Sequence, residues 1–191
     1  MMENTKLQGT KQRMKTPDMV YIAIGAALIT VCSWISIPAT VPFTLQTFAV
    51  FAVLLMLGGE RGTIASIVYV LMGALGLPVF SGFRGGIGFL FGSTGGYIIG
   101  FIFVGLIYKA FTKIWGRKLF VEIAALVLGL IVCYAFGTGW FMFVYIRNTG
   151  EVSLLTVLSW CVFPFIIPDL IKLALAVVIS RRVRTAIPQT D

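Results

Sequence analysis

Apolar residues occur along this chain in long runs, and short polar patches interrupt the runs instead of forming a continuous polar face. A helix needs about 20 apolar residues to cross the hydrocarbon core of a bilayer. The runs predict six helices, at residues 17–37, 44–57, 63–77, 88–111, 120–145 and 153–180. The second is short for a span, which indicates little tilt or a re-entrant start. We expect an all-α polytopic membrane protein of six transmembrane helices.

Composition supports this class, because 59% of residues are hydrophobic and only 12% are charged. Soluble domains carry about 25% charged residues. The ten-residue segments of alternating polarity that are typical of membrane β-barrels do not occur. We expect a polar, disordered leader at residues 1–16, a single membrane domain at 17–184 and a polar tail at 185–191.

The net charge of +8 is unevenly distributed between the two predicted sides. One side carries twelve bases: Lys6, Lys11, Arg13, Lys15, Arg61, Lys109, Lys113, Arg117, Lys118, Arg181, Arg182 and Arg184. The other side carries Arg84 and Arg147. Basic loops stay in the cytoplasm, so both termini are predicted to be cytoplasmic. This topological explanation makes nucleic-acid binding unnecessary.

The sequence lacks the residue patterns that metal binding, disulfide formation, ATP hydrolysis and common forms of catalysis require. The chain has no histidine, and Cys32, Cys133 and Cys161 are scattered through apolar runs, which predicts buried thiols without a disulfide or a metal site. No Walker motif and no pairing of a nucleophile with a base occurs. We therefore expect a protein that is not an enzyme and holds no cofactor of its own.

Two charged residues, Asp169 and Lys172, lie inside the last predicted helix. At about 1.5 Å per residue from Arg181, Lys172 lies roughly 13 Å deep and Asp169 roughly 18 Å deep. Their spacing of three places them on one helix face, and Pro164 and Pro168 precede them. Charges at this depth normally face the interior of a helix bundle. They form either a structural ion pair or, as we favour, the polar floor of a ligand site.

Glycines recur at every fourth position at Gly88, Gly92, Gly96 and Gly100. On one continuous helix they would form a stripe that allows close contact with a second helix. Ala23 and Ala27 form a similar pair of small residues in the first helix, which predicts a docking surface for another helix.

Two segments on the outer side contain further candidates for binding. The glycine-rich loop at residues 77–86 carries Phe80, Phe83 and Arg84, and such a loop can cover a pocket. The segment ATVPFTLQTF places Gln46 at the top of a span, where its amide offers both donors and an acceptor. The alternative for this segment is a helix cap by Thr44.

Four blocks in order, VPFTLQTF, GLPVFSGFRGG, GSTGGYIIGF and FIIPDLIK, resemble the BioY family, the biotin-binding substrate components of energy-coupling-factor vitamin transporters. The resemblance runs from the first helix to the sixth. It departs at Ser93, where the family pattern expects proline, and this affects the stiffness of the loop. It implies a six-helix protein that captures biotin from outside and works with a transmembrane coupling protein and two cytoplasmic ATPases, which use the ATP.

The resemblance also implies roles for individual residues. Asp169 would accept from an N–H of the ureido ring, and Lys172 would donate to the ureido carbonyl or neutralise Asp169. Arg84 would meet the carboxylate, and Ala23 and Ala27 would meet the coupling protein. The apolar walls are predicted to include Phe80, Tyr97 and Trp140, and the ligand-binding set is completed by Gln46, Ser81 and Ser93.

Other functions fit part of the pattern. The alternative function nearest to biotin capture is that of a substrate component for another vitamin. A second alternative is an ion-coupled secondary carrier with Asp169 as the titrating group. An intramembrane enzyme is disfavoured by the lack of a catalytic pair. The small molecule that copurifies with the chain would distinguish them.

Overall fold

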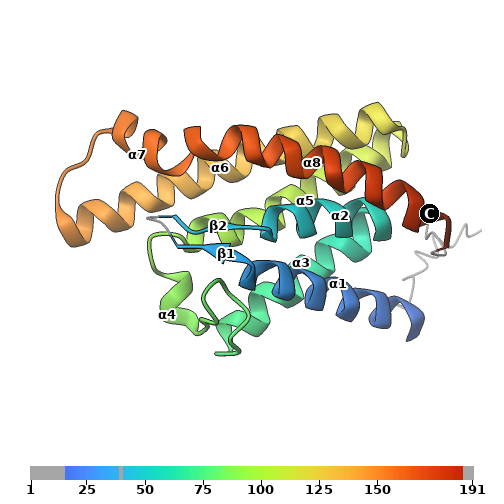
Figure 1. Cartoon of the computed structure of the whole chain (residues 1–191), viewed down its shortest axis with the longest axis horizontal. Helices are drawn as coiled ribbons and strands as arrows, with labels where there is room; N and C mark the ends of the chain where they lie inside the picture. Colours follow the sequence, from blue (N-terminus) through green and yellow to red (C-terminus); the bar gives the residue numbers. More distant parts are fainter. Residues whose placement is uncertain (1–15, 39–40, 187–191) are drawn as a thin grey trace, which may run out of the picture.

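The computed structural model describes residues 16–38 and 41–186 as a bundle of helices that lie roughly side by side (Figure 1). The helices are α1 (Thr16–Trp34), α2 (Gln46–Leu57), α3 (Gly59–Ala74), α4 (Ile87–Leu90), α5 (Gly95–Trp115), α6 (Leu119–Thr149), α7 (Leu154–Cys161) and α8 (Phe163–Val183), followed by a 3₁₀ turn, η1 (Arg184–Ala186). Two short strands, β1 (Ser36–Ile37) and β2 (Phe43–Thr44), pair antiparallel. Of the predicted leader at 1–16 only Thr16 is described, and it begins α1. Of the predicted tail at 185–191 only Thr185 and Ala186 are described, and they belong to η1; the rest of both segments lies outside the described residues.

Membrane character is visible in helix length and in what the helices expose. Four helical segments of the described chain are long and apolar enough to cross a membrane: Thr16–Trp34, Gly95–Trp115, Leu119–Thr149 and Leu154–Val183. The outward faces carry large apolar side chains, such as Ile131, Ile167 and Val178, each more than half exposed. Extended apolar surface of this kind is unusual on a soluble monomer, whereas a bilayer covers it. The predicted helical membrane class is confirmed, with two short strands that the sequence did not predict.

The described ends of the chain lie together. Figure 1 shows that α1 begins and α8 ends at the same end of the bundle, while the two strands, α4 and the connection from α6 to α7 lie toward the other end. Arg61 pairs with Asp18 at the start of α1, and Arg184 at the end of α8 pairs with Glu122. Arg61, Arg117 and Arg184, three of the bases that the sequence assigned to one side, therefore lie near the same end of the bundle. Four further bases of that side lie outside the described residues: Lys6, Lys11, Arg13 and Lys15.

Two predicted helices are interrupted, and both corrections have local causes. The predicted helix at 88–111 divides into α4 and α5, because the chain turns so tightly at Gly95 that a side chain there would overlap the Leu90 carbonyl. The predicted helix at 153–180 divides into α7 and α8 at Val162, whose backbone leaves helical geometry. Pro164 lies at the start of α8, where its missing N–H costs no hydrogen bond.

Other boundaries shift by a few residues. The first helix ends at Trp34 instead of residue 37, because Ser36 and Ile37 pair with Thr44 and Phe43. The third begins at Gly59. Gly58 separates α2 from α3 with a positive φ of 88°, a backbone angle that glycine adopts readily. The fifth is longer than predicted, spanning Leu119–Thr149.

Two of the four glycines in the predicted stripe make the predicted contact with another helix. Gly96 and Gly100 lie in α5 and touch Trp140 and Cys133 of α6, so closely that a methyl group at either glycine would overlap these side chains. Gly88 has open space around it, and Gly92 lies in the turn between α4 and α5. The break before α5 therefore removes the first two glycines from the predicted helix contact.

A buried carboxylate holds several elements together near the described C-terminal end. Glu122 of α6 is 4% exposed and accepts hydrogen bonds from Tyr108 of α5 at 2.9 Å, Arg117 at 3.1 Å and Arg184 of η1 at 2.9 Å. Arg117 also donates to the Leu55 carbonyl of α2 at 2.7 Å. This cluster joins α2, α5, α6 and the end of α8.

We expect Glu122→Gln to lower the melting temperature of the detergent-purified protein by roughly 5–10 °C, because two guanidinium groups lose the charge that they face. The matched control is Glu60→Gln, which removes an exposed pair with Lys109 at 3.5 Å and should change the melting temperature little. Equal melting temperatures for the two variants would show that the Glu122 cluster does not stabilise the bundle.

Candidate functional site

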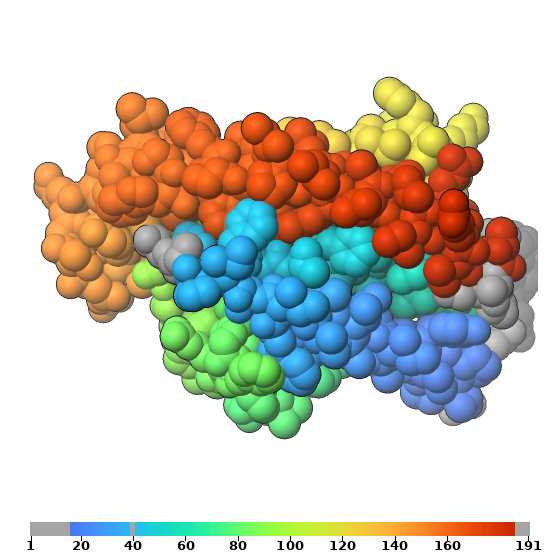
Figure 2. Space-filling model, in the orientation of Figure 1, coloured from blue at the N-terminus to red at the C-terminus, as the bar shows by residue number. Residues whose placement is uncertain are grey.

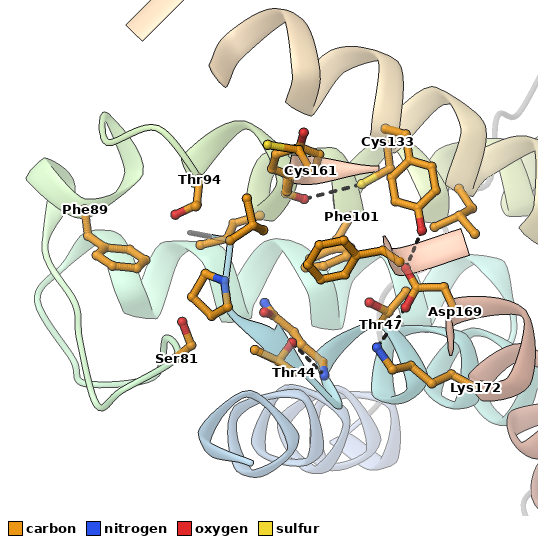
Figure 3. A pocket seen from close by; sticks show the side chains of 18 residues that line it. Thr44, Thr47, Ser81, Phe89, Thr94, Phe101, Cys133, Cys161, Asp169 and Lys172 are labelled. Atoms are coloured by element: carbon orange, nitrogen blue, oxygen red, sulfur yellow. Dashed lines mark hydrogen bonds and ion pairs between the residues drawn. The ribbon is translucent and has the colours of Figure 1, made fainter. Parts of the chain in front are cut away.

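A narrow cavity lies between the helices on the side of the strands and α4 (Figure 3). Its lining comes from β2 and α2, the loop before α4, α4 and α5 with the turn between them, α6, the end of α7, and α8. Its volume is about 70 Å³. Small-molecule pockets usually measure about 300–1,000 Å³. A ligand of vitamin size would therefore require neighbouring side chains or loops to move apart.

The predicted charged pair lies at one end of this cavity (Figure 3). Lys172 Nζ donates to Asp169 Oδ1 at 2.8 Å, and both residues are buried, at 5% and 3% exposure. Tyr134 of α6 donates its hydroxyl to Asp169 Oδ2 at 2.6 Å, and the Lys172 ammonium lies 4.4 Å from the centroid of the Phe43 ring. Both carboxylate oxygens thus have a donor, and the ammonium keeps further N–H groups for a ligand.

The backbone of α8 explains this placement. Asp169 and Lys172 are three residues apart, so they share the helix face that points to the bundle interior. Pro168 lies inside α8 directly before Asp169 and removes one backbone donor there. The structure therefore agrees with both sequence interpretations of the pair, since the two side chains neutralise each other and also face a cavity.

Gln46, at the start of α2, contributes an amide to the same cavity. Its Nε2 donates to the Tyr69 hydroxyl at 2.8 Å, and its backbone N–H donates to Thr44 Oγ1 at 3.2 Å. The predicted helix cap by Thr44 is not formed as such, because Leu45 holds the N-cap position without a side-chain cap hydrogen bond and Thr44 only accepts from the Gln46 N–H. Thr44 and Thr47 add two hydroxyl groups to this wall.

The opposite end of the cavity is formed by Ser81, Phe89 and Thr94 (Figure 3). Ser81 belongs to the glycine-rich loop, Phe89 to α4, and Thr94 precedes α5. The long axis of the cavity therefore joins the buried ion pair to the loop predicted to cover a pocket.

Aromatic and apolar side chains form the walls between the two ends. Tyr97 of α5 lines the cavity, and its hydroxyl lies 3.1 Å from that of Thr138 on α6. Phe101 and Phe165 also line it, and Phe165 stacks on Phe43 with ring centroids 5.5 Å apart. A mostly apolar lining with a few placed polar groups is typical of a small-molecule site.

The structure brings together five of the predicted ligand-binding residues around this cavity and leaves four outside its lining. Asp169, Lys172, Gln46, Ser81 and Tyr97 line it. Phe80 instead packs in the core against Tyr69 and Phe89, and Trp140 donates to the Gly92 carbonyl. Arg84 is exposed on the loop, with its guanidinium 5.9 Å from the Phe89 ring, and Ser93 lies in the turn before α5.

Sequence reasoning missed Tyr134, which contacts Asp169 directly. Tyr134 and Thr138 are polar-tipped residues four positions apart within the apolar α6, and this spacing places them on one face. That pattern was a usable signal. Phe101 and Phe165 carried no comparable signal, because they resemble the many other phenylalanines of the spans.

The alanine pair of α1 lies on the outside of the bundle. Ala23 and Ala27 are exposed, together with Ile24 between them. Figure 2 shows α1 along the surface, uncovered on this face by other parts of the chain. Neither alanine is needed to fill the described core.

Metal binding finds no support among the residues that the structure describes. No group of three or more Cys, Asp and Glu side chains lies close enough to hold an ion there, and Cys32, Cys133 and Cys161 are buried free thiols. The cysteines thus occupy the buried environments that the sequence predicted.

Comparison with protein families and relatives identifies the group to which this chain is related. The family model of the BioY family matches residues 5–189. A biotin transporter BioY of Thermotoga maritima is 41% identical over 173 residues, covering 87% of this chain and 95% of that protein. A biotin transporter BioY2 of Lactococcus lactis subsp. cremoris is 31% identical over 196 residues, covering 100% and 97% of the two chains.

A solved structure agrees with these sequence relationships. The crystal structure of the S-component for biotin from an ECF-type ABC transporter matches this fold with a TM-score of 0.79 and 30% identity, covering 90% of this chain and 95% of that chain. The relatives and the apolar helices together make this a multi-pass membrane protein. Sequence and fold thus lead to the same conclusion: this chain belongs to the BioY family.

Proposed function

We propose that this protein captures biotin from outside the cell as the substrate-binding component of an ECF-type transporter. The observation that carries the proposal is the buried Asp169–Lys172 pair at one end of a cavity, in a chain whose relatives include proteins named biotin transporters. The ureido ring of biotin has two N–H donors and one carbonyl acceptor. Burying such a ring requires an acceptor and a donor in the site, and this pair supplies both.

In this arrangement the ureido ring lies against α8. Asp169 accepts one N–H, and an N–H of Lys172 that Asp169 does not use points to the ureido carbonyl. Tyr134 keeps the carboxylate in place from the other side. The thioether ring and valeryl chain lie between Tyr97, Phe101 and Phe165, where burial of apolar surface contributes about 25 cal/mol per Å².

The carboxylate of biotin lies toward the loop end, near Ser81 and the exposed Arg84. We expect Arg84→Ala to weaken biotin binding by roughly threefold to tenfold, and to leave the weaker binding of the biotin carboxyl amide unchanged, because only the carboxylate carries the charge. Parallel titrations of the two ligands measure this. If the substitution weakens both ligands by the same factor, Arg84 does not contact the carboxylate.

We further propose six membrane crossings, made by α1, α2, α3, α5, α6 and the α7–α8 pair, with both termini in the cytoplasm. The basic residues grouped with the ends of α1 and α8 support this orientation. With 12 and 16 residues, α2 and α3 are about 18 and 24 Å long, and neighbouring helices cover much of both.

The energy for transport is proposed to come from partner subunits. The sequence has no Walker motif, so ATP hydrolysis would belong to two cytoplasmic ATPases, joined to this chain by a transmembrane coupling protein. The exposed Ala23 and Ala27 on α1 are the proposed contact with the coupling protein. This chain then acts as a binding component, not as an enzyme.

The proposal is tested by titrating the detergent-purified protein with biotin, after removal of any copurified vitamin. We expect saturation at one biotin per chain and no competition from thiamine or riboflavin, neither of which has a cyclic urea with two N–H donors. Competition by either vitamin at stoichiometric concentration would instead support a substrate component of different specificity.

A further inference from the structure

A buried tyrosine outside the cavity fixes the orientation of the cavity-facing amide. Tyr69 of α3 is 0% exposed, and its hydroxyl accepts the N–H of Gln46 Nε2 at 2.8 Å. The same hydroxyl donates to the Val79 carbonyl at 3.3 Å, in the loop before α4. Ser33 Oγ of α1 also lies within hydrogen-bond distance of the Val79 carbonyl, and of the Thr30 carbonyl, so its single hydrogen is available to either acceptor.

The donor count sets the direction of these bonds. A phenol has one hydrogen, and a backbone carbonyl can only accept. Because the Tyr69 hydrogen points to Val79, the Tyr69 oxygen must accept from Gln46, and the amide nitrogen of Gln46 is used. Its carbonyl oxygen, Oε1, is then the atom left for the cavity, and among the described residues no donor bonds to it.

We infer that Tyr69 is a positioning residue that makes Gln46 a hydrogen-bond acceptor for the ligand. This inference rests on the proposed biotin function and deepens it. Asp169 accepts one ureido N–H, and Gln46 Oε1 accepts the other, so the cavity matches a ring with two donors and one acceptor. A ligand with an acceptor atom facing Gln46 is disfavoured, because the fixed amide cannot rotate its nitrogen toward that atom.

The probes for this inference are the two cyclic carbamate analogues of biotin, in each of which an oxygen replaces one ring N–H. One analogue places the oxygen against Asp169 and the other places it against Gln46. We expect the wild-type protein to bind each of them about 10- to 100-fold more weakly than biotin, because each leaves an acceptor facing an acceptor.

The decisive variant is Tyr69→Phe, which removes the hydroxyl and leaves the ring. The released amide can rotate and donate Nε2–H to the carbamate oxygen. We expect biotin to bind threefold to tenfold more weakly. For the carbamate whose oxygen faces Gln46, the loss of affinity relative to biotin should fall at least tenfold. For the carbamate whose oxygen faces Asp169, the loss relative to biotin should stay unchanged. The matched control is Tyr108→Phe, which removes a buried hydroxyl that contacts Glu122 and not the cavity. It should leave all three relative affinities unchanged.

A purely structural role for Tyr69 would weaken biotin and both carbamates by one common factor, and that result would overturn the inference. If Tyr69→Phe does not fold, Gln46→Leu tests the acceptor on which the inference depends, because it removes that acceptor and should abolish the penalty for the same single carbamate. Unchanged penalties in Gln46→Leu would also overturn it. A wild-type protein that does not bind biotin would instead contradict the proposed function.

Discussion

Replacing Asp169 with Asn is expected to weaken biotin binding by about 100-fold or more, equivalent to roughly 3 kcal/mol. Asn keeps the size of the side chain but removes the charge that Lys172 faces at 2.8 Å and one of the two strong acceptor oxygens. Truncating one partner of a buried hydrogen-bonded charge pair typically costs 2–5 kcal/mol in binding. Equilibrium titration with radiolabelled biotin in detergent measures the change.

Binding and melting temperature, measured together on single and double variants, distinguish a ligand contact from a structural ion pair. The single variants Asp169→Asn and Lys172→Met should both lose stability, since each disrupts a buried pair. The double variant removes both charges, and its melting temperature should recover much of the loss. If the pair binds biotin, the recovered double variant still binds at least 100-fold more weakly. If the double variant binds like wild type, the pair is only structural.

Replacing Ala27 with Trp is expected to reduce biotin uptake by cells at least tenfold while leaving biotin binding by the purified protein unchanged. Ala27 is exposed on α1 and lies outside the lining of the cavity, so a larger side chain there should not disturb the ligand. Small residues permit close approach of a second helix in a membrane, and an indole ring prevents it. Uptake is measured in cells that also produce the coupling protein and the ATPases.

The control for this substitution is Ile131→Trp, at a residue of α6 that is 56% exposed, outside the lining of the cavity and on a different helix. This variant should retain uptake, because a large apolar residue there already faces outward. Normal uptake by Ala27→Trp, at equal protein level, would place the partner contact elsewhere on the surface.

Helix content could be predicted from hydrophobic runs because each span must satisfy its own backbone hydrogen bonds in lipid. The interruptions could not, since they depend on individual close contacts that a run of apolar residues does not encode. The fold around Gly95 is decided by its contact with the Leu90 carbonyl, and the end of α1 is decided by the pairing of Ser36 with Thr44. Neither contact has a signature in the apolar run itself.

The charged part of the site could be predicted, because a charged side chain inside a membrane span is costly and is rarely present without a role. Asp169 and Lys172 were found because few functions other than pairing or binding retain charges at that depth. Gln46 and Tyr97 emerged from blocks with family resemblance, and the structure places both on the cavity. Phe80 lies in one of those blocks and Trp140 in none, and both were candidates for the aromatic walls. Their packing keeps them out of the lining, because Phe80 packs against Tyr69 and Phe89, and Trp140 donates to the Gly92 carbonyl.

Native mass spectrometry of the purified protein, mixed with equal concentrations of biotin, thiamine, riboflavin and pyridoxine, tests the central claim directly. The account predicts one adduct per chain with the mass of biotin, and its loss in Asp169→Asn. A dominant adduct with the mass of another vitamin, or a biotin adduct that persists undiminished in Asp169→Asn, would contradict it.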